Sequence, residues 1–100
     1  MLPLYRRTII TGGAAPVSVS PPTICSAVTV GNGIAGNNLR IYSRDYQQDN
    51  SRYIDLASGF ERLIRLNLLA PGPQDAQFSP ANVAFYLYCD ATGVVTLEWL

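Results

Sequence analysis

The feature that most constrains this chain is a two-residue alternation of apolar and polar side chains, repeated in short segments along its length. Side chains of an extended strand point alternately to opposite faces, so this pattern is typical of half-buried β-strands. A helical spacing is nearly absent. Clusters of glycine, proline and asparagine separate the segments at intervals typical of small β-domains. We therefore predict an all-β protein, either a small antiparallel β-sandwich or a jelly-roll-like barrel, with about eight strands.

The predicted strands follow the alternating segments, and one of them has a credible helical alternative. Residues 61–69 are rich in leucine, arginine and glutamate, which favour helix, but their alternation favours a strand. All predicted strands are residues 4–11, 17–20, 24–30, 39–44, 53–56, 61–69, 83–89 and 95–99.

Inward-facing side chains of the last three strands are the expected core. Among them, Trp99 continues the face of Val95 and Leu97 and is expected to anchor the core rather than contact a partner. The full set of inward candidates is Ile64, Leu66, Leu68, Phe85, Leu87, Val95, Leu97 and Trp99.

The 100 residues form one predicted domain, 1–100, because no linker separates two core-sized halves. Residues 1–5 are a candidate N-terminal arm. Pro3 lacks the N–H group that a central strand needs, and Leu2, Leu4 and Tyr5 would then lie on a neighbouring subunit. The alternative is that this segment joins the sheet.

Seven arginines balance seven acidic residues, and the formal net charge is zero. A neutral chain attracts neither nucleic acid nor an anionic membrane strongly, so we expect neither as a partner. Arg6 and Arg7 follow the first apolar residues, whereas a secretory signal has the opposite order. Without such a signal we expect Cys25 and Cys89 to be buried thiols; a disulfide would require an oxidising compartment.

The chain contains no histidine, which removes histidine-based acid–base catalysis and histidine-containing zinc sites. Asp45, Asp49 and Asp75 lie within two residues of serine, asparagine or proline, a context in which aspartate side chains favour turns. We therefore expect no enzyme, no catalytic residues, no metal and no cofactor.

One motif matches a dinucleotide-binding pattern, Gly31-Asn-Gly-Ile-Ala-Gly36, with Asp55 further on. Dinucleotide binding needs a helix directly after the glycines, because the N-terminus of that helix holds the pyrophosphate of the dinucleotide. Residues 37–44 alternate instead, so we interpret the motif as a hairpin loop.

Tyrosine and arginine residues share the predicted outer faces of several strands. Both types are enriched in protein interfaces, although tyrosines also pair across strands for purely structural reasons or stack on nucleic acid or sugar rings. Together with the arm, the candidate interface residues are Leu2, Leu4, Tyr5, Arg40, Tyr42, Arg44, Arg65, Tyr86 and Tyr88.

The order of segments resembles that of small β-rich accessory structural proteins of tailed bacteriophage particles. After a short arm, the chain carries Ala14–Val19, Val28–Gly33, Leu39–Arg44 and Ala57–Phe60, and it ends in a hairpin formed by Phe85–Tyr88 and Val94–Trp99.

The resemblance implies a non-enzymatic virion protein, most simply a capsid decoration (cement) protein that binds the outer shell. Its partners would be the major capsid protein or other virion proteins. The chain would contact them as homo-oligomers or as lattice-bound copies, and assembly would take place in the bacterial cytoplasm. Two alternatives stay open. One is a neck or tail accessory protein, and the other is a carbohydrate-binding β-sandwich module that uses the tyrosines for stacking.

Overall fold

The computed structural model describes most of the chain and leaves the candidate arm, residues 1–5, outside the described part. For residues 7–12 it describes only the course and pairing of the strand. The described residues are 7–12, 16–22, 24–46, 48, 51–70, 78, 84–91 and 93–100.

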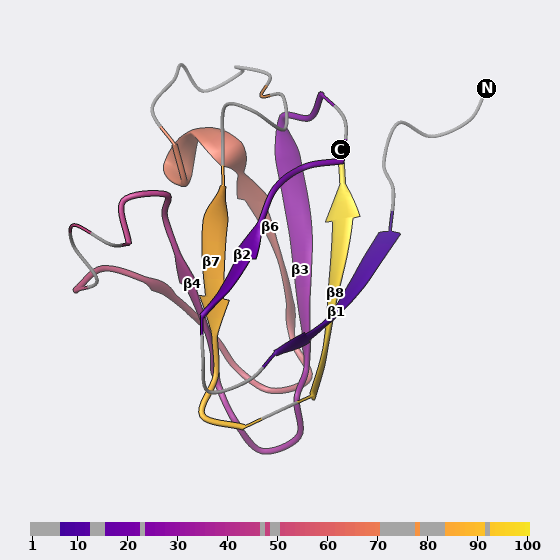
Figure 1. The fold of residues 1–100 in the computed structure, drawn as a ribbon. Helices are drawn as coiled ribbons and strands as arrows, with labels where there is room; N and C mark the ends of the chain where they lie inside the picture. Colours follow the sequence, from indigo (N-terminus) through magenta and orange to yellow (C-terminus); the bar gives the residue numbers. More distant parts are fainter. Residues whose placement is uncertain are drawn as a thin grey trace.

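Eight strands and one short 3-10 helix make up the described structure (Figure 1). In chain order they are β1 (Arg7–Gly12), β2 (Val17–Val19), β3 (Ala27–Gly33), β4 (Leu39–Tyr42), β5 (Ile54–Leu56), β6 (Glu61–Arg65), η1 (Leu66–Leu68), β7 (Phe85–Tyr88) and β8 (Gly93–Trp99).

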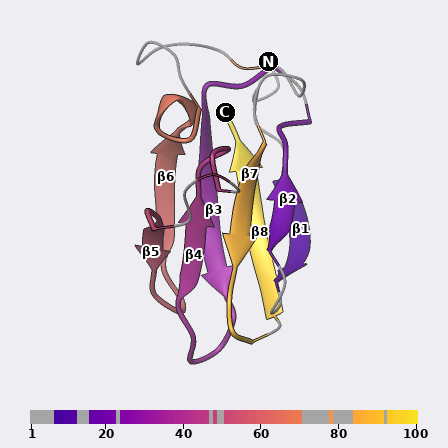
Figure 2. The same ribbon diagram turned by 60° about the vertical axis from the view of Figure 1, so that its left-hand side comes forward.

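The strands form two antiparallel four-stranded sheets, in the orders β1-β8-β3-β6 and β2-β7-β4-β5 (Figure 2). Four antiparallel pairs are nested along the sequence, so that each pair encloses the next. From the outside inward they are β1 with β8, β2 with β7, β3 with β6 and β4 with β5. A hairpin ribbon rolled into two layers produces this order, which is that of a jelly roll. The predicted all-β class is confirmed, and its form is a sandwich of two separate sheets.

Apolar side chains of both sheets fill the space between the layers, as the alternation predicts. Seven of the eight predicted core residues are buried, and Trp99, which is 0% exposed, lies with its ring centroid 5.9 Å from that of Phe85 in the other sheet. The exception is Leu68, which is 64% exposed. Both cysteines are buried thiols.

The prediction of a strand over residues 61–69 is wrong beyond Arg65. The N–H of Leu66 donates to the carbonyl of Ser26, at 2.9 Å, and the N–H of Leu69 then donates to the carbonyl of Leu66, at 3.0 Å. The chain therefore turns as a 3-10 helix. The turn buries Leu66 and Leu69 and directs Leu68 outward, which explains the error in the predicted core.

The motif at residues 31–36 is not a loop throughout, because β3 continues to Gly33. A Cβ at Gly33 would lie 2.7 Å from the carbonyl oxygen of Val94, so the close approach of β8 requires glycine here. Gly36 adopts φ +74° in the turn before β4, a conformation that glycine favours. A turn and a strand follow the motif where a dinucleotide site needs a helix, so that site remains rejected.

Asn32, which the sequence predicts to lie in a hairpin loop, is a buried polar residue. Its Nδ2 donates to the carbonyls of Asn37 and Leu56, at 2.9 and 3.0 Å, and its Oδ1 accepts from the N–H of Ile34, at 2.9 Å. The amide thus joins the end of β3 to the following turn and to β5 in the other sheet. Within the described residues, no helix is long and apolar enough to cross a membrane.

Candidate functional site

The outward face of the β2-β7-β4-β5 sheet gathers most of the tyrosines. Leu39 and Ile41 of β4 are buried in the core, and so are Phe85 and Leu87 of β7. The alternate residues therefore point outward. Cross-strand register places Arg40 of β4 opposite Tyr88 of β7, and Tyr42 opposite Tyr86.

Two further tyrosines from the segment between β4 and β5 complete this surface. The ring centroid of Tyr42 lies 4.6 Å from that of Tyr46 and 5.5 Å from that of Tyr53, and the rings of Tyr46 and Tyr86 are 5.2 Å apart. Such separations are typical of edge-to-face and tilted aromatic pairs. We call the resulting surface the tyrosine face; its residues are Arg40, Tyr42, Tyr46, Tyr53, Tyr86 and Tyr88.

Tyr42 lies at the base of the tyrosine face rather than at its surface. We predicted an outward contact residue, and the side chain does leave the outer side of β4, but it is only 5% exposed. The rings of Tyr46 and Tyr53 pack on it and remove it from solvent. Tyr42 is therefore a supporting residue, whereas Tyr53, which is 43% exposed, presents its ring to solvent.

A guanidinium group lies against the exposed ring. The Cζ atom of Arg40 is 4.7 Å from the ring centroid of Tyr53, within the range of a cation–π interaction. Interaction with the Tyr42 side chain, and then with Tyr53, raises the pKa of Arg40 above its ordinary value. Arg40 therefore carries its positive charge on the tyrosine face under all ordinary conditions.

Two carboxylates border the face and are engaged by neighbouring polar groups. The hydroxyl of Tyr88 donates to Asp90 Oδ1, at 3.0 Å, and this hydrogen bond is the main cause that raises the pKa of Tyr88. Asp55 Oδ2 accepts from Asn38 Nδ2, at 3.0 Å. These contacts fix the polar margin of the face around Arg40.

The structure separates several residues that we predicted on one interface. Arg65 is exposed on β6, in the opposite sheet, so it does not join the tyrosine face. Arg44 lies in the turn after β4, which ends two residues earlier than predicted, and its Nε is 3.9 Å from Asp45. Leu2, Leu4 and Tyr5 lie outside the described residues.

Sequence reasoning missed Tyr46 and Tyr53 as members of the site. Tyr53 carried a usable signal, because it alternates with Ile54 and therefore falls on the side opposite the core. Tyr46 belongs to a polar loop without periodicity, and nothing in the local pattern indicates that its ring returns to Tyr42 and Tyr86.

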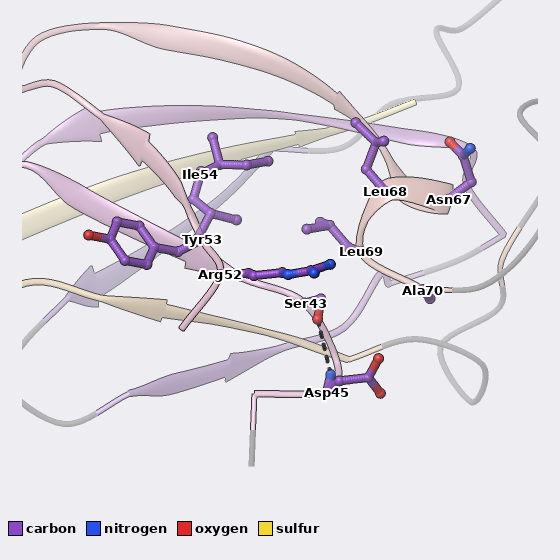
Figure 3. Close-up of a pocket in the computed structure, with 10 residues that line it drawn as sticks. Ser43, Asp45, Arg52, Tyr53, Ile54, Asn67, Leu68, Leu69 and Ala70 are labelled. Carbon is purple, nitrogen blue, oxygen red and sulfur yellow. Dashed lines mark hydrogen bonds between the residues drawn. The ribbon is translucent and has the colours of Figure 1, made fainter. Parts of the chain in front are cut away.

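A cleft adjoins the tyrosine face and shares Tyr53 with it (Figure 3). It has a volume of about 440 Å³ and lies between the end of β4, the residues before β5 and η1. The N–H of Arg44 donates to the carbonyl of Leu69, at 3.0 Å, and holds the two walls together. Arg52, Tyr53, Asn67, Leu68 and Leu69 are among the residues that line it.

Among the described residues, no group of three or more cysteine and acidic side chains is placed to hold a metal ion. Comparison of the chain with models of known protein families, with characterised proteins and with solved structures gives no match.

Proposed function

We propose that this protein is a non-enzymatic structural component of a virus particle and that it binds a protein of the outer shell through the tyrosine face. The observation that carries the proposal is the convergence of five of the six tyrosines with Arg40 on one side of the sandwich. Neither a cofactor nor a chemical step is required for this role.

The composition of the tyrosine face favours a protein as the partner. Tyrosine and arginine are the residue types that most often carry the binding energy of protein interfaces. The rings are already packed on one another through Tyr42, so little side-chain entropy is lost when a partner covers them. A net charge of zero gives no general attraction to nucleic acid.

The fold and the resemblance support the placement in a virion. Jelly rolls occur repeatedly in viral capsid proteins, which is an argument from fold alone, and the segments described above resemble accessory proteins of tailed phages. A lattice of identical sites would let many modest contacts act together. On this account each copy docks its tyrosine face on the shell.

A carbohydrate-binding module is the second candidate, because lectin domains also use the jelly roll and Tyr53 is exposed. The mutual tilt of the rings disfavours it. Tyr46 and Tyr86, the contacting pair of partly exposed rings, are inclined to each other by 35°, whereas a flat sugar ring stacks best on rings that share a plane. A glycan array tests this candidate directly.

The experiment for the main proposal is quantitative mass spectrometry of purified particles of the virus that encodes the chain. We expect the protein in the hundreds of copies that a shell lattice provides. A count matching one ring would contradict the shell location and indicate the neck or tail. Absence of the protein from particles, together with glycan binding, would overturn the proposal in favour of the second candidate.

A further inference from the structure

Strand β6 lies at the edge of the β1-β8-β3-β6 sheet, and in the described part of the chain its only strand neighbour is β3 (Figure 2). Four of its five residues are exposed. An exposed edge strand presents unpaired N–H and C=O groups, and many proteins keep such edges very short. The edge strands of the other sheet, β2 and β5, have three residues each. β6 therefore offers a longer edge to a further strand than either of them.

The pairing of β6 with β3 determines which backbone groups face the open edge. The N–H of Asn32 donates to the carbonyl of Phe60, at 2.9 Å, and these two residues continue the register of the strand pair. In an antiparallel pair, every second residue bonds to the neighbouring strand. The even-numbered residues of β6 therefore direct their backbone groups to β3, whereas Glu61, Leu63 and Arg65 direct theirs to the open edge.

These three residues make β6 complementary to a second copy of itself. If two copies run antiparallel and are paired about Leu63, Glu61 of each copy lies directly opposite Arg65 of the partner subunit. Opposite charges in directly opposed positions stabilise an antiparallel strand pair. Within one copy the two residues are four positions apart, about 13 Å along a strand, so they cannot pair with each other. A second copy supplies the counter-charge that each side chain lacks on its own strand.

The charges of β6 also disfavour other ways of pairing two copies. A shift of the antiparallel register to a centre at Arg62 places Arg62 opposite Arg62 of the partner subunit, and like charges in directly opposed positions are destabilising. A shift to a centre at Ile64 leaves Glu61 without an arginine opposite it. Parallel strands in register place each charge beside its own copy. Edge charges of this kind select one pairing by excluding the others.

Exposed apolar residues lie in the middle of β6 and at both of its ends. Leu63 is 56% exposed, Phe60 before the strand is 63% exposed, and Leu68 of η1 is 64% exposed. Phe60 is three residues before Leu63, and η1 begins three residues after it. Pairing about Leu63 therefore brings the Phe60 end of each copy level with η1 of the other. Removal of this apolar surface from water would add to the strand pairing.

We propose that a second copy of this chain adds to β6 as an antiparallel strand centred on Leu63, so that two four-stranded sheets become one continuous sheet of a dimer. Addition of a strand to an exposed sheet edge is a recurring mode of protein recognition. Directly opposed residues of an antiparallel pair point to the same face, so the two-fold axis is perpendicular to the sheet. Both copies then turn the tyrosine face to the same side. The dimer does not depend on the proposed function, but it would let two tyrosine faces dock on one shell.

The experiment measures the mass of the full chain in solution by sedimentation velocity over a range of concentrations. A reducing agent keeps the thiols from linking two copies. Glu61→Arg and Arg65→Glu each place like charges opposite one another in the proposed dimer, whereas an equal mixture of the two variants restores opposite charges at every position. Asp45→Arg makes the same change of charge as Glu61→Arg, at a side chain that is 66% exposed after β4, and serves as the matched control.

We expect the unaltered protein and Asp45→Arg to dimerise as concentration rises, and each of the two β6 variants to dimerise at least about tenfold more weakly. The mixture of the two variants should recover the dimer. Amide hydrogen exchange of Leu63 and Arg65 should slow as the dimer forms, because their N–H groups face the open edge. A monomer at every concentration up to roughly 1 mM, a dimer that the charge reversals leave unchanged, or a mixture that stays monomeric would each overturn the inference. No shell protein takes part, so failure would leave the role of the tyrosine face standing.

Discussion

Trp99 is the largest fully buried side chain of the described structure, and it joins the two sheets by packing near Phe85. Replacement by alanine removes this contact and leaves a cavity that the surrounding strands can fill only in part. We expect Trp99→Ala to lower the free energy of unfolding by about 3–5 kcal/mol, measured by denaturant titration. The adjacent Leu100, which is 41% exposed, serves as the control, and Leu100→Ala should change stability by less than about 0.5 kcal/mol. Unchanged stability of Trp99→Ala would refute its role in the core.

The hydrogen bond between Tyr88 and Asp90 should affect the titration of Tyr88 and the stability of the protein at alkaline pH. Because Asp90 Oδ1 accepts a hydrogen bond from the Tyr88 hydroxyl, the pKa of Tyr88 is raised, and Tyr88 holds its phenolic proton more tightly in the folded state than in the unfolded chain. The linked stability is present below the ordinary tyrosine pKa of about 10 and is lost as pH rises through the raised value. We expect Asp90→Asn to shift the titration of Tyr88 to lower pH, as followed by NMR of labelled tyrosine rings. An unchanged titration would show that Asp90 does not stabilise the protonated form of Tyr88.

At the scale of single elements, local patterning predicts where strands occur better than where they end. The alternating faces of β7 and β8 follow directly from the sequence because both strands have one buried side. The end of β6 does not, since it is determined by the hydrogen bond from Leu66 to Ser26, a residue distant in sequence. In the same way, Asn32 is a polar residue between two glycines, a pattern typical of a turn. Only its hydrogen bonds to residues distant in sequence show that it belongs to β3.

The Asn32 side chain supports the junction between β3, the turn that follows and β5. Substitution by alanine leaves the N–H of Ile34 and the carbonyl of Leu56 without this partner in a buried setting. Each unsatisfied buried group costs about 1–3 kcal/mol, so Asn32→Ala should destabilise the protein by at least about 2 kcal/mol in thermal or denaturant unfolding. Asn37→Ala, which removes only an exposed bond to Ala35, is the control. Equal stabilities of the two variants would contradict the structural role of Asn32.

For the whole molecule, the strand order is the part that sequence reasoning could not supply. β1 pairs with β8, and Arg7 stands opposite Glu98, so the outermost pair of the jelly roll joins the two ends of the described chain (Figure 1). No local signal specifies such a distant partner. The same limit applies to the candidate site, because the pattern indicated Arg40, Tyr86 and Tyr88 but could not show that Tyr42 is covered by rings from a loop.

We propose that the tyrosine face contacts a partner rather than stabilises the sheet. The most direct test measures both properties in one double variant, Tyr53→Ala with Tyr86→Ala, against Leu100→Ala, a residue that is 41% exposed and follows β8 of the opposite sheet. Stability is measured by denaturant titration, and binding is measured to shells that lack the protein.

We expect the double variant to lose at least about tenfold in affinity for the shells. Its free energy of unfolding should fall by no more than about 2 kcal/mol, as expected for two cross-strand aromatic contacts, while Leu100→Ala should bind normally. A double variant that binds the shells with full affinity, whatever its stability, would contradict the claim.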